Sequence, residues 1–141
     1  MCCEDKAIEQ IKRHEGLRLF PYQCTAGKQT IGYGRNIESR GISRDEAELL
    51  LKNDMQLVRD QLEDSTPWYM SMCEPRKAVF ENMAFNLGIT GFLRFKRMLS
   101  AAQSGNYETA ASEMLDSRWS SQVGNRANEL AEQMRSGEFS A

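Results

Sequence analysis

Three side chains that could perform acid–base chemistry lie close together in the N-terminal part of the sequence, in the spacing E-x8-C-x5-T. The first is Glu15, at the end of a predicted helix. The negative pole of the helix dipole and partial burial in a cleft would both disfavour its ionised carboxylate. A carboxyl group that keeps its proton near neutral pH is a general acid. The alternative for an arbitrary glutamate, and the more common one, is a solvated side chain beside a helix end.

The other two side chains are Cys24 and Thr30. An ordinary thiol, with a pKa of ~8.5, is mostly neutral at pH 7, whereas a thiolate could activate a water molecule. The alternative for Cys24 is a small, buried, apolar side chain. The hydroxyl of Thr30 could hold a water molecule. Its alternative is a threonine that simply favours a strand.

The elements that must position these groups are a helix and a small sheet. Residues 4–15 show the apolar spacing of a helix with one buried face, and Gly16 is a natural terminator. Residues 17–22 and 29–33 are short runs rich in aromatic and β-branched residues, separated by a glycine turn at 25–27. This pattern predicts a small β-hairpin or meander.

Two glycines within the second run, Gly32 and Gly34, would weaken an ordinary strand. They therefore indicate either a bend or a close approach of the backbone to another group.

The sequence then becomes helical. Ser43 and Glu46 fit a capping box that begins a long helix, which Pro67 must end. Pro75 suits the first turn of the next helix, which we expect to close at Gly88. Further helices are predicted over 92–103, 107–118 and 125–135. Helices therefore dominate, and a small α+β lobe joined by a long helix to a helical lobe would leave a cleft where ligands usually bind.

Composition narrows the class of protein. The chain has 141 residues, 40% hydrophobic and 27% charged, which is typical of one globular domain. No segment approaches the roughly 20 apolar residues of a membrane span, and residues 1–5 do not resemble a secretory signal. The net charge of −2 argues against a nucleic-acid-binding protein. The basic run 94–97 is better explained as a solvated helix face. We expect a soluble, cytosolic chain.

The cysteines indicate no scaffold of disulfides and no structural metal. The four cysteines, at positions 2, 3, 24 and 73, are too sparse for a disulfide framework. There is no C-x-x-C motif, and His14 is the single histidine. Reduced thiols and no metal site are therefore expected.

Three blocks of sequence carry a family resemblance. The run Glu15-Gly-Leu-Arg through Tyr22-x-Cys-Thr-x-Gly and Thr30-Ile-Gly-x-Gly resembles the active-site region of phage-type lysozymes. These are the glycoside hydrolase family 24 muramidases of T-even and lambdoid phages. Residues 82–88, Asn-Met-Ala-Phe-Asn-Leu-Gly, resemble the first helix of that family's C-terminal lobe, and residues 117–127 resemble its terminal signature.

The resemblance implies a mostly helical α+β, lysozyme-like fold in one domain, residues 1–141. A small lobe with the sheet would cover about 12–55. A larger helical lobe would cover about 56–141 together with the N-terminal helix, and the long helix would join the two lobes.

The resemblance also implies roles for individual residues. Glu15 would be the general acid, and Cys24 and Thr30 would position and activate the attacking water. Arg126 matches an arginine that pairs with this glutamate, which would favour the ionised carboxylate and oppose the helix dipole. The residues matching substrate-contacting positions are Asn36, Phe85 and Asn86.

Two positions depart from the family pattern. The best-known members have aspartate at the position of Cys24, and a minority have cysteine. Relatives often have histidine at the position of Arg35, so a stabilising pair known in the family is altered in this chain.

The function that the resemblance implies is that of an endolysin, a muramidase hydrolysing the β-1,4 bond between N-acetylmuramic acid and N-acetylglucosamine in peptidoglycan. Inversion at the anomeric carbon is expected, with no metal or organic cofactor. We expect a monomer in the host cytoplasm that reaches the wall after a holin permeabilises the membrane. The alternatives are a lytic transglycosylase that gives a 1,6-anhydro product, and a non-catalytic wall-binding protein.

Overall fold

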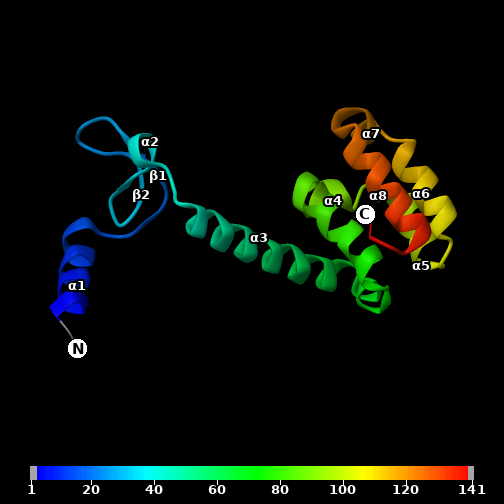
Figure 1. Cartoon of the computed structure of the whole chain (residues 1–141), viewed down its shortest axis with the longest axis horizontal. Helices are drawn as coiled ribbons and strands as arrows, with labels where there is room; N and C mark the ends of the chain where they lie inside the picture. Colours follow the sequence, from blue (N-terminus) through cyan, green and yellow to red (C-terminus); the bar gives the residue numbers. More distant parts are fainter. Residues whose placement is uncertain (1–2, 140–141) are drawn as a thin grey trace. The chain divides into compact units, whose positions relative to one another are not determined.

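The computed structural model describes residues 3–139 and is shown in Figure 1. The chain divides into two compact units, with the boundary after Leu49. In the described residues, the first unit contains two helices, a three-stranded sheet and the start of a long helix, and the second is helical. The predicted α+β, mostly helical class is confirmed. In residues 3–139, no helix has both the length and the apolar character needed to cross a membrane. The sequence-based lobe boundaries stay a prediction.

The first unit opens with α1 (Cys3–Glu15). The helix ends where the sequence predicts, because Gly16 takes a positive φ of 72°. Its N–H donates to the carbonyl of Lys12 at 2.9 Å. A residue with a β-carbon is strained in this conformation, and glycine is not. Glu15 is therefore the last helical residue of α1.

The sheet that follows has the strand order β1-β2-β3, with both pairs antiparallel. Its strands are β1 (Arg18–Gln23), β2 (Gln29–Gly32) and β3 (Arg35–Asn36). The hairpin of β1 and β2 is confirmed, whereas β3 adds a strand that the sequence did not predict. The short helix α2 (Ile37–Arg40) comes directly after β3.

A capping box begins α3 (Arg44–Ser65), as predicted. The N–H of Glu46 donates to Oγ of Ser43 at 3.1 Å, and the N–H of Ser43 donates to Oε1 of Glu46 at 2.8 Å. Both Nη atoms of Arg35 donate to the Glu46 carboxylate, with Nη1 2.9 Å from Oε1. Arg35 also donates to the carbonyl of Gly41 at 3.1 Å. This arginine therefore ties β3 to the start of α3.

The second unit contains short helices. After the 3-10 helix η1 (Pro67–Ser71) comes α4 (Glu74–Phe92). The helical segment that begins α4 ends at Gly88 as predicted, because Gly88 is non-helical with φ 77° and ψ 156°. A further helical turn, which the sequence analysis did not predict, follows this kink to Phe92. The remaining helices are α5 (Lys96–Gln103), α6 (Tyr107–Leu115), α7 (Arg118–Val123) and α8 (Asn125–Ser136). The predicted helix over 107–118 is therefore two helices.

Aromatic and methionine side chains form the core of the second unit. The rings of Phe80 and Phe92 are fully buried, with centroids 5.0 Å apart. Met114 and Trp119 are buried, as the sequence analysis expected. Trp119 packs edge-on against Phe95, with ring centroids 6.1 Å apart. This packing fixes the faces of α4 and α7 that carry the polar groups described below.

Candidate functional site

Glu15 lies in contact with the turn between β2 and β3. Its side chain is exposed, yet its carboxylate lies against Gly34: a β-carbon at position 34 would be 2.6 Å from Oε2. Gly34 also has a positive φ of 79°. Beside it, Nζ of Lys12 lies 5.6 Å from the centroid of the Tyr33 ring. Of the two alternatives predicted for Gly32 and Gly34, a bend or a close approach, the structure shows a close approach at Gly34, which brings the candidate acid against the sheet.

Cys24 begins the loop that links β1 to β2. Its N–H donates to the carbonyl of Lys28 at 2.9 Å, and its carbonyl accepts the N–H of Gly27 at 2.8 Å. The backbone amides of Lys28 and Ala26 and the hydroxyl of Thr30 lower the pKa of Cys24, because hydrogen bonds to sulfur favour the thiolate. Partial burial opposes this effect. The loop therefore favours the form of Cys24 that can act as a base.

Thr30 lies on β2, opposite Tyr22 on one neighbour and Asn36 on the other. Only 3% of its surface is exposed. Its hydroxyl donates to the carbonyl of Lys28 at 2.9 Å. A hydroxyl has one hydrogen, so Thr30 donates to this carbonyl or to the Cys24 sulfur, and its lone pairs stay available as acceptors. The structure thus brings Cys24 and Thr30 together.

Asn36 has a local role in the described chain. Its Oδ1 accepts the N–H of Ser39 at 3.0 Å and so caps α2. Asn36 also lies opposite Thr30 in the sheet. Its substrate contact stays a prediction.

The remaining predicted residues, Phe85, Asn86 and Arg126, belong to the second unit. Phe85 is 42% exposed on α4. Asn86 accepts the indole N–H of Trp119 at 2.8 Å, and Arg126 donates through Nε to Oδ1 of Asn82 at 2.8 Å. The pairing of Arg126 with the candidate acid stays a prediction.

Sequence reasoning missed Asn82. One signal could have found it, since Asn82 lies four residues before Asn86 within one predicted helix and therefore shares a helix face with it.

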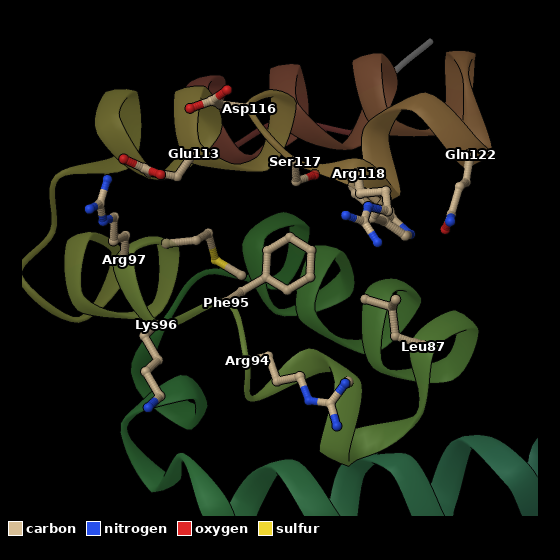
Figure 2. Close-up of a pocket in the computed structure, with 13 residues that line it drawn as sticks. Leu87, Arg94, Phe95, Lys96, Arg97, Glu113, Asp116, Ser117, Arg118 and Gln122 are labelled. Atoms are coloured by element: carbon tan, nitrogen blue, oxygen red, sulfur yellow. The ribbon is translucent and has the colours of Figure 1, made fainter.

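A pocket of about 600 Å³ lies between α4, α5, α6 and α7 in the second unit (Figure 2). Figure 2 shows Arg118 and Gln122 on one side of it and Leu87 and Arg94 facing them. Its charged lining residues are Arg94, Lys96, Arg97, Glu113, Asp116 and Arg118. The lining also includes the aromatic side chains of Phe95 and Trp119. Side chains of both charges beside aromatic rings suit a polar ligand rather than a purely apolar one.

Residues 3–139 contain no group of three or more histidine, cysteine, aspartate or glutamate side chains arranged to hold a metal ion.

Comparison with known proteins assigns the family. The family model for phage lysozyme matches residues 12–136. An endolysin of Acyrthosiphon pisum secondary endosymbiont phage 1 is 33% identical over 124 residues, which is 85% of this chain and 81% of that protein. A probable T4-type lysozyme of Dictyostelium discoideum is 26% identical over 94% of this chain and 95% of its own length. The pre-baseplate central spike protein of Enterobacteria phage T4 is 28% identical over 86% of this chain, but the match covers only 26% of that protein's length. The chain therefore belongs to the phage lysozyme family.

Proposed function

We propose that this chain is an endolysin that hydrolyses the β-1,4 bond between N-acetylmuramic acid and N-acetylglucosamine in peptidoglycan. Membership of the phage lysozyme family supports the class of reaction. The contact of the Glu15 carboxylate with Gly34 carries the proposal, because it holds an exposed acid against the sheet that has Thr30 on β2 and Cys24 in the loop between β1 and β2.

The proposed reaction needs one proton donor and one proton acceptor. Glu15 gives its proton to the glycosidic oxygen as the bond from that oxygen to the anomeric carbon breaks. The oxygen of a water molecule forms the new bond to the anomeric carbon from the opposite face, which inverts the configuration. The thiolate of Cys24 takes the proton that this water loses. Its lowered pKa supports this role, because more of the thiol is ionised near neutral pH.

Thr30 orients the attacking water in this proposal. The single hydrogen of its hydroxyl is donated to the Lys28 carbonyl or to the Cys24 sulfur. The oxygen lone pairs of Thr30 can then accept a hydrogen bond from the water. Its burial supports a single orientation of this hydroxyl.

The test is the loss of turbidity of permeabilised Gram-negative cells. Glu15→Gln keeps the size of the side chain and removes its acid, so we expect lysis to fall by at least about a hundredfold, the range of general acid catalysis. Glu9→Gln is the matched control, because Glu9 lies on the same helix and makes only an exposed ion pair with Lys12 at 3.5 Å. Equal lysis by Glu15→Gln and the unaltered protein would leave a non-catalytic wall-binding protein.

The lytic transglycosylase is the alternative enzyme, since it needs only one acid. The lowered pKa of Cys24 favours hydrolysis over it, because the thiolate supplies the base that water attack requires. Mass spectrometry of digested peptidoglycan separates the two reactions. A hydrated reducing end supports hydrolysis, and a 1,6-anhydro end supports the transglycosylase.

The proposal includes where the protein acts. We propose that it works as a monomer on glycan strands of the wall, and that it reaches them from the host cytoplasm after a holin permeabilises the membrane. Expression with and without a membrane-permeabilising partner tests this route. Lysis without such a partner contradicts it.

A further inference from the structure

The backbone of Lys28 connects the two candidate groups of the sheet. Its carbonyl accepts the N–H of Cys24 at 2.9 Å, and it can accept the hydroxyl of Thr30, also at 2.9 Å. A carbonyl oxygen has two lone pairs, so it can serve both donors. The N–H of Lys28 contributes most to the lowering of the pKa of Cys24. A displacement of this backbone therefore changes the hydrogen bonds of both candidate groups.

Glu38 on α2 bonds to the same stretch of backbone. Its Oε1 accepts the N–H of Gln29 at 3.3 Å, and its Oε2 lies 3.4 Å from Nζ of Lys28. The N–H of Gln29 and the carbonyl of Lys28 belong to one peptide unit. Because this unit is planar and trans, its N–H and its carbonyl point in opposite directions. A carboxylate that holds the N–H thereby fixes the direction of the carbonyl that serves Cys24 and Thr30.

The short helix that carries Glu38 is fixed to the sheet at both ends. At its start, Asn36 caps the helix with its side chain and pairs with Thr30 in the sheet. At its end, the carbonyl of Gly41 accepts a hydrogen bond from Nη1 of Arg35 on β3 at 3.1 Å. Glu38 therefore approaches the loop from an element that the sheet itself holds in place.

We propose that Glu38 is a positioning residue, which orients the peptide unit between Lys28 and Gln29 and so holds Cys24 and Thr30 in place for the attacking water. The inference rests on the proposed function for the roles of Cys24 and Thr30. It adds a residue that lies outside the E-x8-C-x5-T spacing and acts through the backbone. The ion pair with Lys28 is exposed on both sides and contributes little to stability, so the role of Glu38 is orientation rather than folding.

The test uses two substitutions that remove the same charge and differ in the acceptor that remains. Glu38→Gln keeps an oxygen that can accept the N–H of Gln29, whereas Glu38→Ala keeps none. Ser39→Ala is the matched control on α2. Within the described residues the hydroxyl of Ser39 makes no hydrogen bond, and its N–H keeps the bond to Asn36. The rate at which iodoacetamide alkylates Cys24 in the full-length chain is followed against pH by peptide mass mapping.

Charge and position predict opposite shifts for Glu38→Ala. The loss of a negative charge alone would favour the thiolate of Cys24 and move the midpoint of alkylation to lower pH. The loss of the orienting bond weakens the hydrogen bonds to sulfur. We therefore expect the midpoint to rise by about 0.5–1 pH unit, the effect of roughly one hydrogen bond. Lysis at pH 7 should fall roughly three- to tenfold with the thiolate fraction.

The other two variants should not show this rise. Glu38→Gln should have a midpoint at or below that of the unaltered protein, and Ser39→Ala should leave it unchanged. All rates are measured at a temperature where thermal melts show every variant to be folded. Every variant keeps the other charged or titratable side chains of the three strands, the loop at 24–28 and α2, which are Arg18, Tyr22, Lys28, Arg35 and Arg40.

Three outcomes overturn the inference: an unchanged or lower midpoint in Glu38→Ala, an equal rise in Glu38→Gln, or an equal rise in Ser39→Ala. Alkylation needs no glycan, so these results are independent of the lysis assay with Glu15→Gln. If Glu15→Gln lyses cells normally while the midpoints shift as expected, the proposed hydrolysis is wrong and the positioning of Cys24 by Glu38 stands.

Discussion

Glu15 and Gly34 are in direct contact, and a β-carbon at position 34 would lie 2.6 Å from Oε2 and 2.9 Å from Cδ of Glu15. Gly34→Ala should therefore displace the carboxylate of the candidate acid. It should also cost ~1–2 kcal/mol of stability, because alanine is strained at a φ of 79°. We expect lysis by folded Gly34→Ala to fall by at least about tenfold, since small displacements of a catalytic group are costly.

Gly27→Ala is the control for this prediction. Gly27 has a φ of 78° in the same unit, but its added β-carbon would meet no atom within 4 Å. The two variants should lose similar stability in thermal melts, and only Gly34→Ala should lose activity at a temperature where both are folded. Equal activity of the two would show that the contact does not position the acid.

Cys24 should control the acid side of the pH–activity profile. Its pKa is lowered by the amides of Lys28 and Ala26 and by the Thr30 hydroxyl, so its thiolate persists to a lower pH than that of an ordinary thiol. Activity should fall as pH drops through this pKa. Cys24→Asp should stay active and carry the acid limb to lower pH, because a carboxylate loses its charge only near pH ~4. Cys24→Ala should lose most activity.

Alkylation gives a second measurement on the same thiol. The rate of reaction of Cys24 with iodoacetamide, followed by peptide mass mapping, should rise with pH through a midpoint below that of an ordinary thiol. Alkylation of Cys24 should suppress lysis. Cys73→Ala is the control, because Cys73 is an exposed thiol of the second unit. Equal effects of Cys24→Ala and Cys73→Ala would reduce Cys24 to a packing role.

Local signals predicted the elements that hold the candidate acid and the start of α3. The glycine at 16 ends α1 through its own positive φ, and the reciprocal bonds of Ser43 and Glu46 lie within one turn. Such features depend only on residues close together in the sequence, so the local sequence is enough to predict them. The strand at 35–36 and the helix at 37–40 are too short for any periodic pattern, and they went unpredicted for that reason.

Contacts between distant residues set the limit of the sequence analysis. Gly88 does break α4, but the turn after it persists because Phe92 is fully buried in the core. The bond between Asn86 and Trp119 joins residues 33 apart, and no local pattern orients that amide. Arg35 forms an ion pair with Glu46, and the proximity of the two depends on how the chain turns between them. The alteration of a family pair at this position stays a prediction.

The Arg35–Glu46 pair should give the first unit an acid-sensitive stability. Hydrogen bonds from Arg35 lower the pKa of Glu46 to about 2 from an ordinary value of 4.5. The carboxylate is therefore favoured in the folded state, and its contribution is complete above pH 4.5 and lost as pH falls toward 2. Glu46→Gln keeps the capping oxygen and removes the charge. It should melt at a lower temperature than the unaltered protein at pH 7, with the difference shrinking between pH 4.5 and 2.

Glu48→Gln is the control for that pH dependence, since Glu48 is an exposed residue of the same helix with no ion pair among the described residues. It should melt like the unaltered protein throughout the pH range. A difference between Glu46→Gln and the unaltered protein that persists at pH 2 would contradict the assignment.

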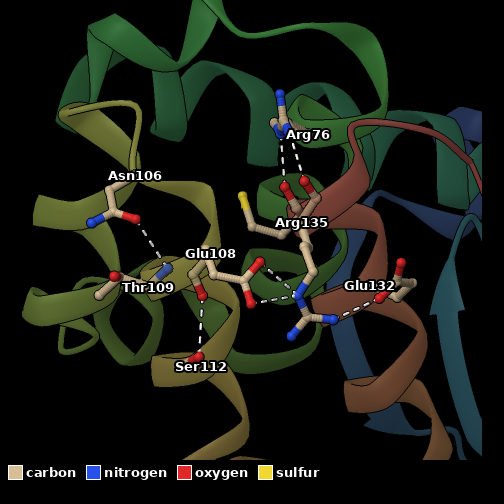
Figure 3. A network of polar contacts seen from close by, with 8 residues as sticks. Arg76, Asn106, Glu108, Thr109, Ser112, Glu132 and Arg135 are labelled. Atoms are coloured by element: carbon tan, nitrogen blue, oxygen red, sulfur yellow. Dashed lines mark hydrogen bonds and ion pairs between the residues drawn. The ribbon is translucent and has the colours of Figure 1, made fainter.

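Arg76 on α4 hydrogen-bonds to the end of α8, as Figure 3 shows. Its Nε donates to the carbonyl of Met134 at 2.7 Å and its Nη2 to that of Arg135 at 2.9 Å, while its guanidinium lies 3.6 Å from the Tyr107 ring centroid. Lysine cannot make this fork of bonds, so Arg76→Lys should lower the free energy of unfolding by about 2–4 kcal/mol in denaturant titrations. Gly137→Ala should also destabilise, because its β-carbon would lie 2.9 Å from Cζ of Arg76. In the Arg76→Lys background the added methyl group meets a slimmer side chain. The double variant should therefore lose less stability than the sum of the losses of the two single variants. Strict additivity would show that Gly137 and Arg76 are not coupled.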